Sequence, residues 1–119
     1  MNVPDEGYHH IGLCRALESL VLRYCRETGD AATEHIVGLP QLRRYFASYT
    51  RITDRTSELL SRMPSLERIT LDRCATVTNA GLAHLARLPR LRELRVSGPQ
   101  ITADVAGHFS SRVGVHHSL

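Results

Sequence analysis

A leucine-rich unit that recurs every 24 or 25 residues limits what this chain can fold into. Its most regular copy begins at Leu66 and reads LERITLDRCATVTNAGLAHLARL. In the first half of this unit, apolar and polar residues alternate, which predicts a strand with one buried face. In the second half, apolar residues follow a helical period, which predicts a short helix. One such unit cannot bury its own apolar face, so the copies are expected to stack on one another.

Four copies of the unit can be aligned along the chain. They begin 25, 24 and 25 residues apart, at Leu17, Leu42, Leu66 and Leu91. The second copy, LRRYFASYT, departs furthest from the pattern. The second halves of the copies predict helices near Asp30–Ile36, Asp54–Leu60, Asn79–Ala86 and Ala103–Phe109. Three of these helices follow a threonine that can cap them, namely Thr53, Thr78 and Thr102.

Both ends of the chain continue the repeat pattern. The segment VPDEGYHHIGLCRAL, which starts at Val3, aligns without a gap on VTNAGLAHLARLPRL, which starts at Val77. We therefore expect a half repeat over residues 3–16. At the other end, RVGVHH alternates like a strand, which predicts a closing strand over residues 112–117 with Val113 and Val115 pointing inward. The prediction is a single domain over residues 1–119.

The alignment of the copies also predicts which side chains meet. Stacked strands would form a buried column of Leu20, Tyr45, Ile69, Leu94 and Val113. Stacked helices would form a second buried column of Ile11, Ile36, Leu60, Leu85 and Phe109. Just before the strands, the charge alternates in sign along Glu18, Arg43, Glu67 and Arg92. Strands in register lie about 4.8 Å apart, so each of these acids would face a base, which favours this register over a slipped one.

The unit resembles the cysteine-containing subtype of leucine-rich repeats. The resemblance rests on the spacing of Leu66, Ile69, Leu71 and Cys74, on Cys25 in the same position of the first copy, and on the phrases ITDRTSELL, VTNAGLAHL and ITADVAGHF. It covers nearly the whole chain and implies an α/β fold: a right-handed leucine-rich-repeat solenoid, with a parallel concave sheet and short helices on the convex side. Most members of the family are recognition modules, and many eukaryotic ones carry an F-box, for which this chain has no room. All fifteen basic residues are Arg, which is typical of a GC-rich bacterial coding sequence, so we expect a bacterial-type member without an F-box.

Composition sets further limits on function. The chain has 119 residues, a net charge of +3 and 42% hydrophobic residues, values that are ordinary for a globular protein. It has no apolar run of about 20 residues and no visible signal peptide. Three cysteines without C-x-x-C spacing predict neither a disulfide framework nor a zinc site, so we expect a cytoplasmic protein. The low net charge argues against a dedicated nucleic-acid binder, although weak binding remains an alternative.

No residues in the sequence make a convincing catalytic or metal site. The alignment places His10, His35, His84 and His108 in one helical column, but no carboxylate or cysteine recurs beside them. Cys25 and Cys74 are expected to be small buried side chains that bond the turn backbone, and Cys14 is expected in the core. Because no nucleophile–base pair and no glycine-rich phosphate loop can be identified, we predict no enzymatic activity, no metal and no cofactor.

The candidate binding surface is the concave face of the predicted sheet. Its outward positions carry three of the six aromatic residues and several arginines, and protein interfaces are enriched in both types. The predicted partner-binding residues are three anchors and three arginines that would orient acidic groups: Tyr24, Phe46, Tyr49, Arg23, Arg68 and Arg73. In the alternative interpretation, Phe46 and Tyr49 only shield the poorly packed second copy.

The sequence therefore predicts a non-catalytic protein–protein interaction module or scaffold. Its protein partner is expected to carry acidic and apolar groups, with no role for a membrane. A second hypothesis is a structural C-terminal fragment of a longer repeat protein, or a scaffold that self-associates through its N-terminal edge. This hypothesis rests on the half repeat at residues 3–16, whose exposed edge would need a cap or a partner.

Overall fold

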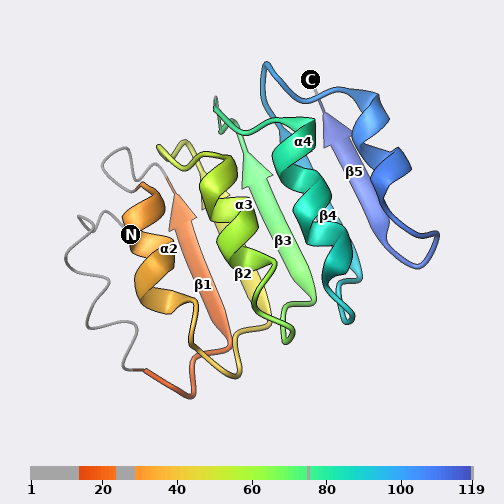
Figure 1. Ribbon diagram of the computed structural model, residues 1–119. Helices are drawn as coiled ribbons and strands as arrows, with labels where there is room; N and C mark the ends of the chain where they lie inside the picture. Colours follow the sequence, from red (N-terminus) through yellow and green to blue (C-terminus); the bar gives the residue numbers. More distant parts are fainter. Residues whose placement is uncertain (1–13, 24–28, 75, 119) are drawn as a thin grey trace.

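The computed structural model describes residues 14–23, 29–74 and 76–118 of the chain. The five strands of this part form one parallel sheet, in which each strand pairs with the next one in the sequence (Figure 1). The elements are β1 Ser19–Arg23, α2 Asp30–Ile36, β2 Arg44–Ser48, α3 Asp54–Leu60, β3 Arg68–Asp72, α4 Asn79–Leu82, η2 Ala83–Arg87, β4 Glu93–Ser97, η3 Ala103–His108 and β5 Gly114–Ser118. The helices lie side by side over one face of the sheet. The predicted α/β class with a parallel sheet is confirmed.

The register of the first four strands follows the repeat spacing. Leu20 pairs with Tyr45, Tyr45 with Ile69, and Ile69 with Leu94. The predicted register of the last strand is wrong, because the residue that pairs with Leu94 is Val115 and not Val113. Residues 113 and 115 lie on the same face of an alternating strand, so the pattern cannot distinguish two registers that differ by two residues.

The helices follow their predicted positions, but not all are α-helical. Helices α2 and α3 have the predicted bounds, whereas the third begins as α4 and continues as the 3₁₀ helix η2, and the last, η3, is entirely 3₁₀. The hydroxyl of Thr53 accepts a hydrogen bond from the Arg55 amide at 3.2 Å, and that of Thr78 accepts one from the Gly81 amide at 3.4 Å. The predicted side-chain cap at Thr102 does not form.

The core lies between the sheet and the helices. Four members of the first predicted column, Leu20, Tyr45, Ile69 and Leu94, are buried, whereas Val113 is only partly buried and packs against the core. In the second column, Ile36, Leu60 and Leu85 are buried and Phe109 packs against the core, while Ile11 lies outside the described residues. No helix in this part of the chain has the length and apolar character needed to cross a membrane.

The prediction for Cys74 is confirmed, and the prediction for Cys14 is wrong. Cys74 is buried, and its thiol lies 3.5 Å from the Asp72 carbonyl oxygen, as expected for a side chain that bonds the turn backbone. Burial raises the pKa of the Cys74 thiol. Cys14 is exposed rather than part of the core. Cys14 precedes β1, the first described strand, whereas the corresponding Leu39 is buried and lies between β1 and β2 in the sequence. Cys25 lies outside the described residues.

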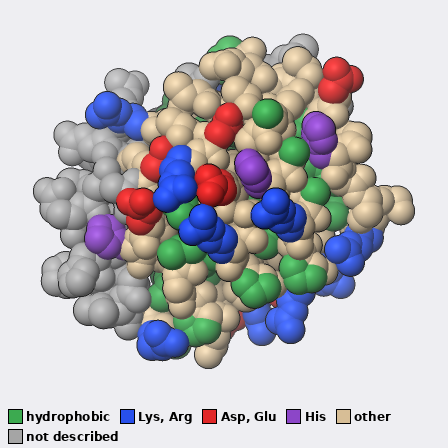
Figure 2. Space-filling model, viewed as in Figure 1, with side chains coloured by type: hydrophobic (Ala, Val, Ile, Leu, Met, Phe, Trp, Pro, Cys, Tyr) green, Lys and Arg blue, Asp and Glu red, His purple; other side chains and the backbone are tan. Residues whose placement is uncertain are grey.

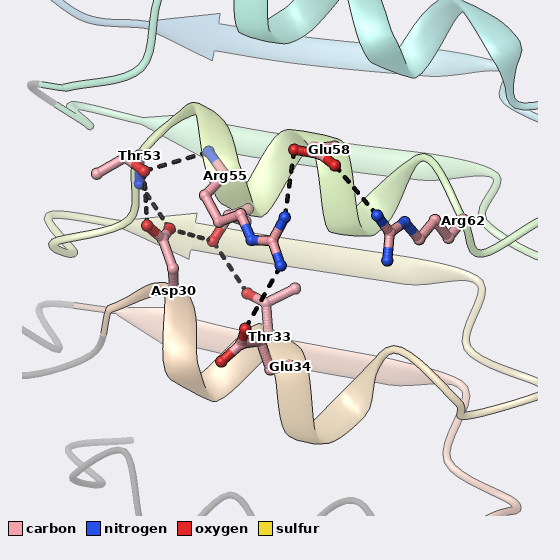
Figure 3. A network of polar contacts seen from close by, with 8 residues as sticks. Asp30, Thr33, Glu34, Thr53, Arg55, Glu58 and Arg62 are labelled. Atoms are coloured by element: carbon pink, nitrogen blue, oxygen red, sulfur yellow. Dashed lines mark hydrogen bonds and ion pairs between the residues drawn. The ribbon is translucent and has the colours of Figure 1, made fainter.

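A ladder of side-chain hydrogen bonds joins the start of each helix to the next one. The Asp30 carboxylate, in the first turn of α2, accepts bonds from the Thr53 amide at 2.8 Å, the Thr53 hydroxyl at 2.6 Å and the Thr56 hydroxyl at 2.7 Å (Figure 3). Partial burial alone would raise the pKa of the Asp30 carboxyl, but the hydrogen bonds from Thr53 and Thr56 outweigh it and lower this pKa. The first turn of one helix thus holds the start of the next.

The same contact recurs in the following copies. Asp54 accepts bonds from the Thr78 amide at 2.7 Å and the Thr78 hydroxyl at 2.6 Å. Asn79 takes the equivalent position in the third copy: its Oδ1 accepts a bond from the Thr102 amide at 3.1 Å, and its Nδ2 donates to the Thr102 hydroxyl at 2.7 Å. Thr53 and Thr78 donate to the preceding Asp, whereas the Thr102 hydroxyl accepts from Asn79 and does not cap its own helix. The ladder ties successive helices together by charge-assisted or amide hydrogen bonds.

The predicted ladder of alternating charges forms only in part. Arg43 lies 3.6 Å from Glu18 and 3.7 Å from Glu67, so it bridges the acids on both sides. Arg92 and Glu67 are joined through the backbone, by the Arg92 amide and the Glu67 carbonyl oxygen at 2.8 Å, and form no ion pair. These side chains are largely exposed, and exposed pairs contribute only about 0.2–1 kcal/mol each.

Ser57→Ala is expected to stabilise the protein by about 1 kcal/mol. Ser57 is fully buried in α3, and its hydroxyl has no hydrogen-bond partner among the residues that the structure describes. An unpaired buried hydroxyl costs free energy that alanine avoids, and alanine is also the better helix former. Urea denaturation would measure the change. Thr56→Ala is the matched control: its buried hydroxyl bonds Asp30 and Thr33, so this variant should be less stable than wild type.

Candidate protein-binding face

The face of the sheet opposite the helices is called the uncovered face here, because no described element lies over it. Alternate strand positions point to it. In β1, Leu20 and Leu22 are buried beneath the helices, whereas Val21 between them is 39% exposed. The same alternation continues in β2 and β3, where exposed Arg44 and Arg68 occupy the first strand position. The face is therefore formed by the residue positions that the repeat alignment predicts.

An apolar row crosses the middle of the uncovered face. Phe46 in β2 lies in register between Val21 of β1 and Thr70 of β3. Its side chain is half-buried, so it is less exposed than the sequence suggested, because side chains of both neighbouring strands flank it. Phe46 and Val21 nevertheless place an aromatic and an aliphatic side chain together on a face without covering helices.

Two arginines lie beside this apolar row at the start of the strands. Arg44 and Arg68 are direct cross-strand neighbours, and neither forms an ion pair within the described part of the chain. Arg44 only donates to the Ser19 hydroxyl at 3.3 Å. The next residue in the row is Glu93, which already binds the Arg95 guanidinium at 2.8 Å, and that hydrogen bond lowers the pKa of the Glu93 carboxyl. Arg68 faces Glu93 across the strands and contributes to this lowered pKa, but Arg44 and Arg68 remain two neighbouring like charges without an ion pair, which favours an anionic ligand.

Tyr49 and Arg73 contact each other just beyond the ends of β2 and β3. The Arg73 guanidinium carbon lies 5.8 Å from the centre of the Tyr49 ring, a cation–π arrangement. Both residues adopt left-handed backbone conformations, with φ of 56° for Tyr49 and 53° for Arg73. Such conformations cost a non-glycine residue of the order of 1–3 kcal/mol and concentrate at functional sites. The two side chains lie together just beyond the C-terminal ends of these strands.

A pocket of about 420 Å³ opens next to this pair, lined by Tyr49, Arg73, Ser97, Gly98, Pro99 and Ile101. Gly98 occupies the position in its repeat that Tyr49 and Arg73 occupy in theirs, so the row of large side chains stops there. A Cβ atom at residue 98 would lie 3.0 Å from the Cys74 carbonyl oxygen, so the backbone is already close. Ser97 supports the pocket, since its hydroxyl accepts a hydrogen bond from the Arg73 amide at 3.0 Å.

The structure brings together some of the predicted binding residues. Tyr49 and Arg73 are in contact, and Phe46 and Arg68 lie on adjacent strands of the same face. Arg23 is the last residue of β1, but its side chain is not described, and Tyr24 lies outside the described residues. The pocket residues Ser97, Gly98, Pro99 and Ile101 were not predicted as binding residues. Comparing the repeats position by position could have indicated them, because glycine replaces a large side chain at residue 98.

The described residues contain no group of three His, Cys, Asp or Glu side chains placed to hold a metal ion. The polar groups of the uncovered face are instead arginines, hydroxyls, the His116 imidazole and two carboxylates, Asp72 and Glu93. The Ser97 hydroxyl lies 3.5 Å from Asp72 Oδ1, and Glu93 is bound to Arg95. These polar groups can bind charged groups by hydrogen bonds and ion pairs. The apolar row beside them can bind apolar groups by packing contacts.

In comparisons with known proteins, no protein-family model matches the chain, and no curated protein sequence matches it.

Proposed function

We propose that this chain is a leucine-rich repeat protein of the cysteine-containing subtype that binds another protein, without chemistry of its own. In this proposal the repeats form a right-handed solenoid, and the uncovered face is its concave side. The repeat register of β1 to β4 supports the stacking of equivalent units. Parallel strands joined by helices on one face are connected with right-handed crossovers in nearly all proteins.

One observation carries the binding proposal: Phe46 and Val21 lie beside Arg44 and Arg68, which form no ion pair within the described residues, on a face that no described helix covers. A half-exposed aromatic residue beside arginines is the composition of interface hot spots, because it combines large contact area with charged hydrogen-bond donors. The partner segment would place an apolar side chain against Phe46 and a carboxylate against Arg44 and Arg68. Tyr49 and Arg73 would extend this surface towards the pocket beside Gly98.

Phe46→Ala is expected to weaken partner binding at least about tenfold, or about 1.4 kcal/mol, while the protein stays folded. Peptides selected from a random library on the immobilised chain would supply the ligand. We expect them to combine Asp or Glu with Leu, Phe or Trp, and to lose affinity for the Phe46→Ala, Arg68→Gln and Tyr49→Ala variants. Fluorescence anisotropy would measure the dissociation constants, and circular dichroism would measure the melting temperatures.

Arg62→Gln is the matched control, because Arg62 is exposed beside α3 and pairs with Glu58 on the helix side (Figure 3). It removes the same charge as Arg68→Gln but should leave peptide affinity unchanged. Equal losses in both variants, or selected peptides indifferent to Phe46, would contradict the proposed face. A fall of more than about 8 °C in the melting temperature of Phe46→Ala would show instead that Phe46 serves packing.

A further inference from the structure

A second surface feature lies at the opposite end of the strands, where each strand begins. A hollow of about 600 Å³, called the arginine hollow here, is lined by Glu67, Pro89, Arg90, Leu91, Arg92 and Arg112. These residues come from the loops that precede β3, β4 and β5. Figure 2 shows Arg side chains along the lower right margin of the molecule, where the loops before β4 and β5 lie in Figure 1. The hollow shares no residue with the proposed protein-binding surface.

The loops that carry the three arginines are held by backbone hydrogen bonds. The Arg92 amide donates to the Glu67 carbonyl oxygen at 2.8 Å, and the Arg92 carbonyl oxygen accepts from the Gly114 amide at 2.8 Å. The turn that contains Arg112 is closed by a bond from the Val113 amide to the Ser110 carbonyl oxygen at 3.0 Å. Leu91 is buried beneath the hollow. The arginine backbones are thus positioned before any ligand arrives.

The charges of the hollow are not balanced internally. Arg90, Arg92 and Arg112 are exposed, and none of them forms an ion pair with another described residue. The single carboxylate of the hollow, Glu67, pairs with Arg43 at 3.7 Å. Three guanidinium groups and one carboxylate leave the hollow with a net charge of +2. Gathering unpaired like charges is unfavourable in the free protein, and an anion in the hollow would relieve that repulsion.

We propose that the arginine hollow binds a phosphate monoester carried on a protein segment. A phosphate monoester has a charge close to −2 at neutral pH, which matches the hollow, and its oxygens accept the paired hydrogen bonds of guanidinium groups. A nucleic-acid strand fits less well, because it presents a continuous line of phosphates, whereas this hollow is local and has Glu67 on its rim. The whole chain also carries a net charge of only +3.

The test uses a fluorescein-labelled peptide of alanine and leucine with one central phosphoserine, and the same peptide with serine or glutamate at that position. We expect the phosphoserine peptide to bind at least about tenfold more tightly than either control peptide. Its binding should strengthen as the pH rises through about 6, where the phosphate acquires its second charge. The double variant Arg90→Gln/Arg112→Gln should lose this preference, and Glu67→Gln should increase the affinity.

Arg51→Gln serves as the control variant, because Arg51 is exposed and lines a different hollow. The variant removes the same kind of charge. It should bind the phosphoserine peptide like wild type. An equal loss in Arg51→Gln, or no preference for phosphoserine over serine, would overturn the proposal. Tighter binding of oligo-dT than of the phosphoserine peptide, lost in the Arg90→Gln/Arg112→Gln variant, would also overturn it in favour of a nucleic-acid site.

Discussion

Gly81→Ala is expected to destabilise the protein by about 3 kcal/mol, although alanine is the better residue in a helix. Gly81 is buried in α4, and a Cβ atom there would overlap the side chain of Asp54 in the preceding helix. Asp54 cannot move aside without losing its bonds to the Thr78 amide at 2.7 Å and the Thr78 hydroxyl at 2.6 Å. The close approach of α3 and α4 therefore requires glycine at this position.

Gly107→Ala is the matched control for this prediction. Gly107 lies in η3, and a Cβ atom there would meet nothing within 4 Å, so alanine should leave stability unchanged or raise it by up to about 1 kcal/mol. Urea denaturation would measure both variants. The Gly81→Ala/Asp54→Ala double variant should lose less stability than the sum of the single changes, because the clash and the displaced carboxylate are one interaction. Wild-type stability of Gly81→Ala would contradict the prediction.

Asp30→Ala is expected to destabilise the protein by about 2 kcal/mol at neutral pH. The change removes one carboxylate that accepts three hydrogen bonds, from the Thr53 amide and from the hydroxyls of Thr53 and Thr56. The Thr56 hydroxyl is buried, so it would lose a partner that water does not readily replace. Asp30→Asn should cost less, because Asn79 makes the equivalent bonds to Thr102 in the third copy.

The Asp30 variants also test the pH dependence of stability. The hydrogen bonds from Thr53 and Thr56 lower the pKa of Asp30 in the folded state. A carboxyl with a lowered pKa stabilises the folded protein above its unfolded pKa of about 3.9, and this contribution is lost as the pH falls through the lower, folded value. The difference in unfolding free energy between wild type and Asp30→Asn should therefore shrink in acid. A difference that stays constant from neutral pH to about pH 2 would contradict this assignment.

The repeat spacing predicted most of the fold because each copy places the same contacts at the same positions. Leu20, Tyr45, Ile69 and Leu94 could be assigned to one column because a slip of one residue would have exposed every buried side chain. The prediction failed where this constraint is absent. A slip of two residues leaves Val113 and Val115 on the same face, and Cys14, before the first described strand, is exposed although its counterpart Leu39 is buried.

The candidate site could be predicted only in outline. Strand alternation was enough to place Phe46 and Arg68 on the face opposite the helices. It could not indicate that Tyr49 and Arg73 adopt left-handed conformations and contact each other, because the same residues also fit an ordinary turn. The arginine hollow was missed for a similar reason. Its residues belong to different copies of the repeat and come together only where the loops before three neighbouring strands meet.

The sequence by itself determined the α/β class, the strand order and the register of the first four strands, because burial of alternate side chains repeats with a fixed period. The tertiary structure decided how neighbouring copies bind one another through Asp30, Asp54 and Asn79. It also decided which charged side chains find partners. Such contacts depend on directions and distances between side chains of different copies, and a period in the sequence does not specify either.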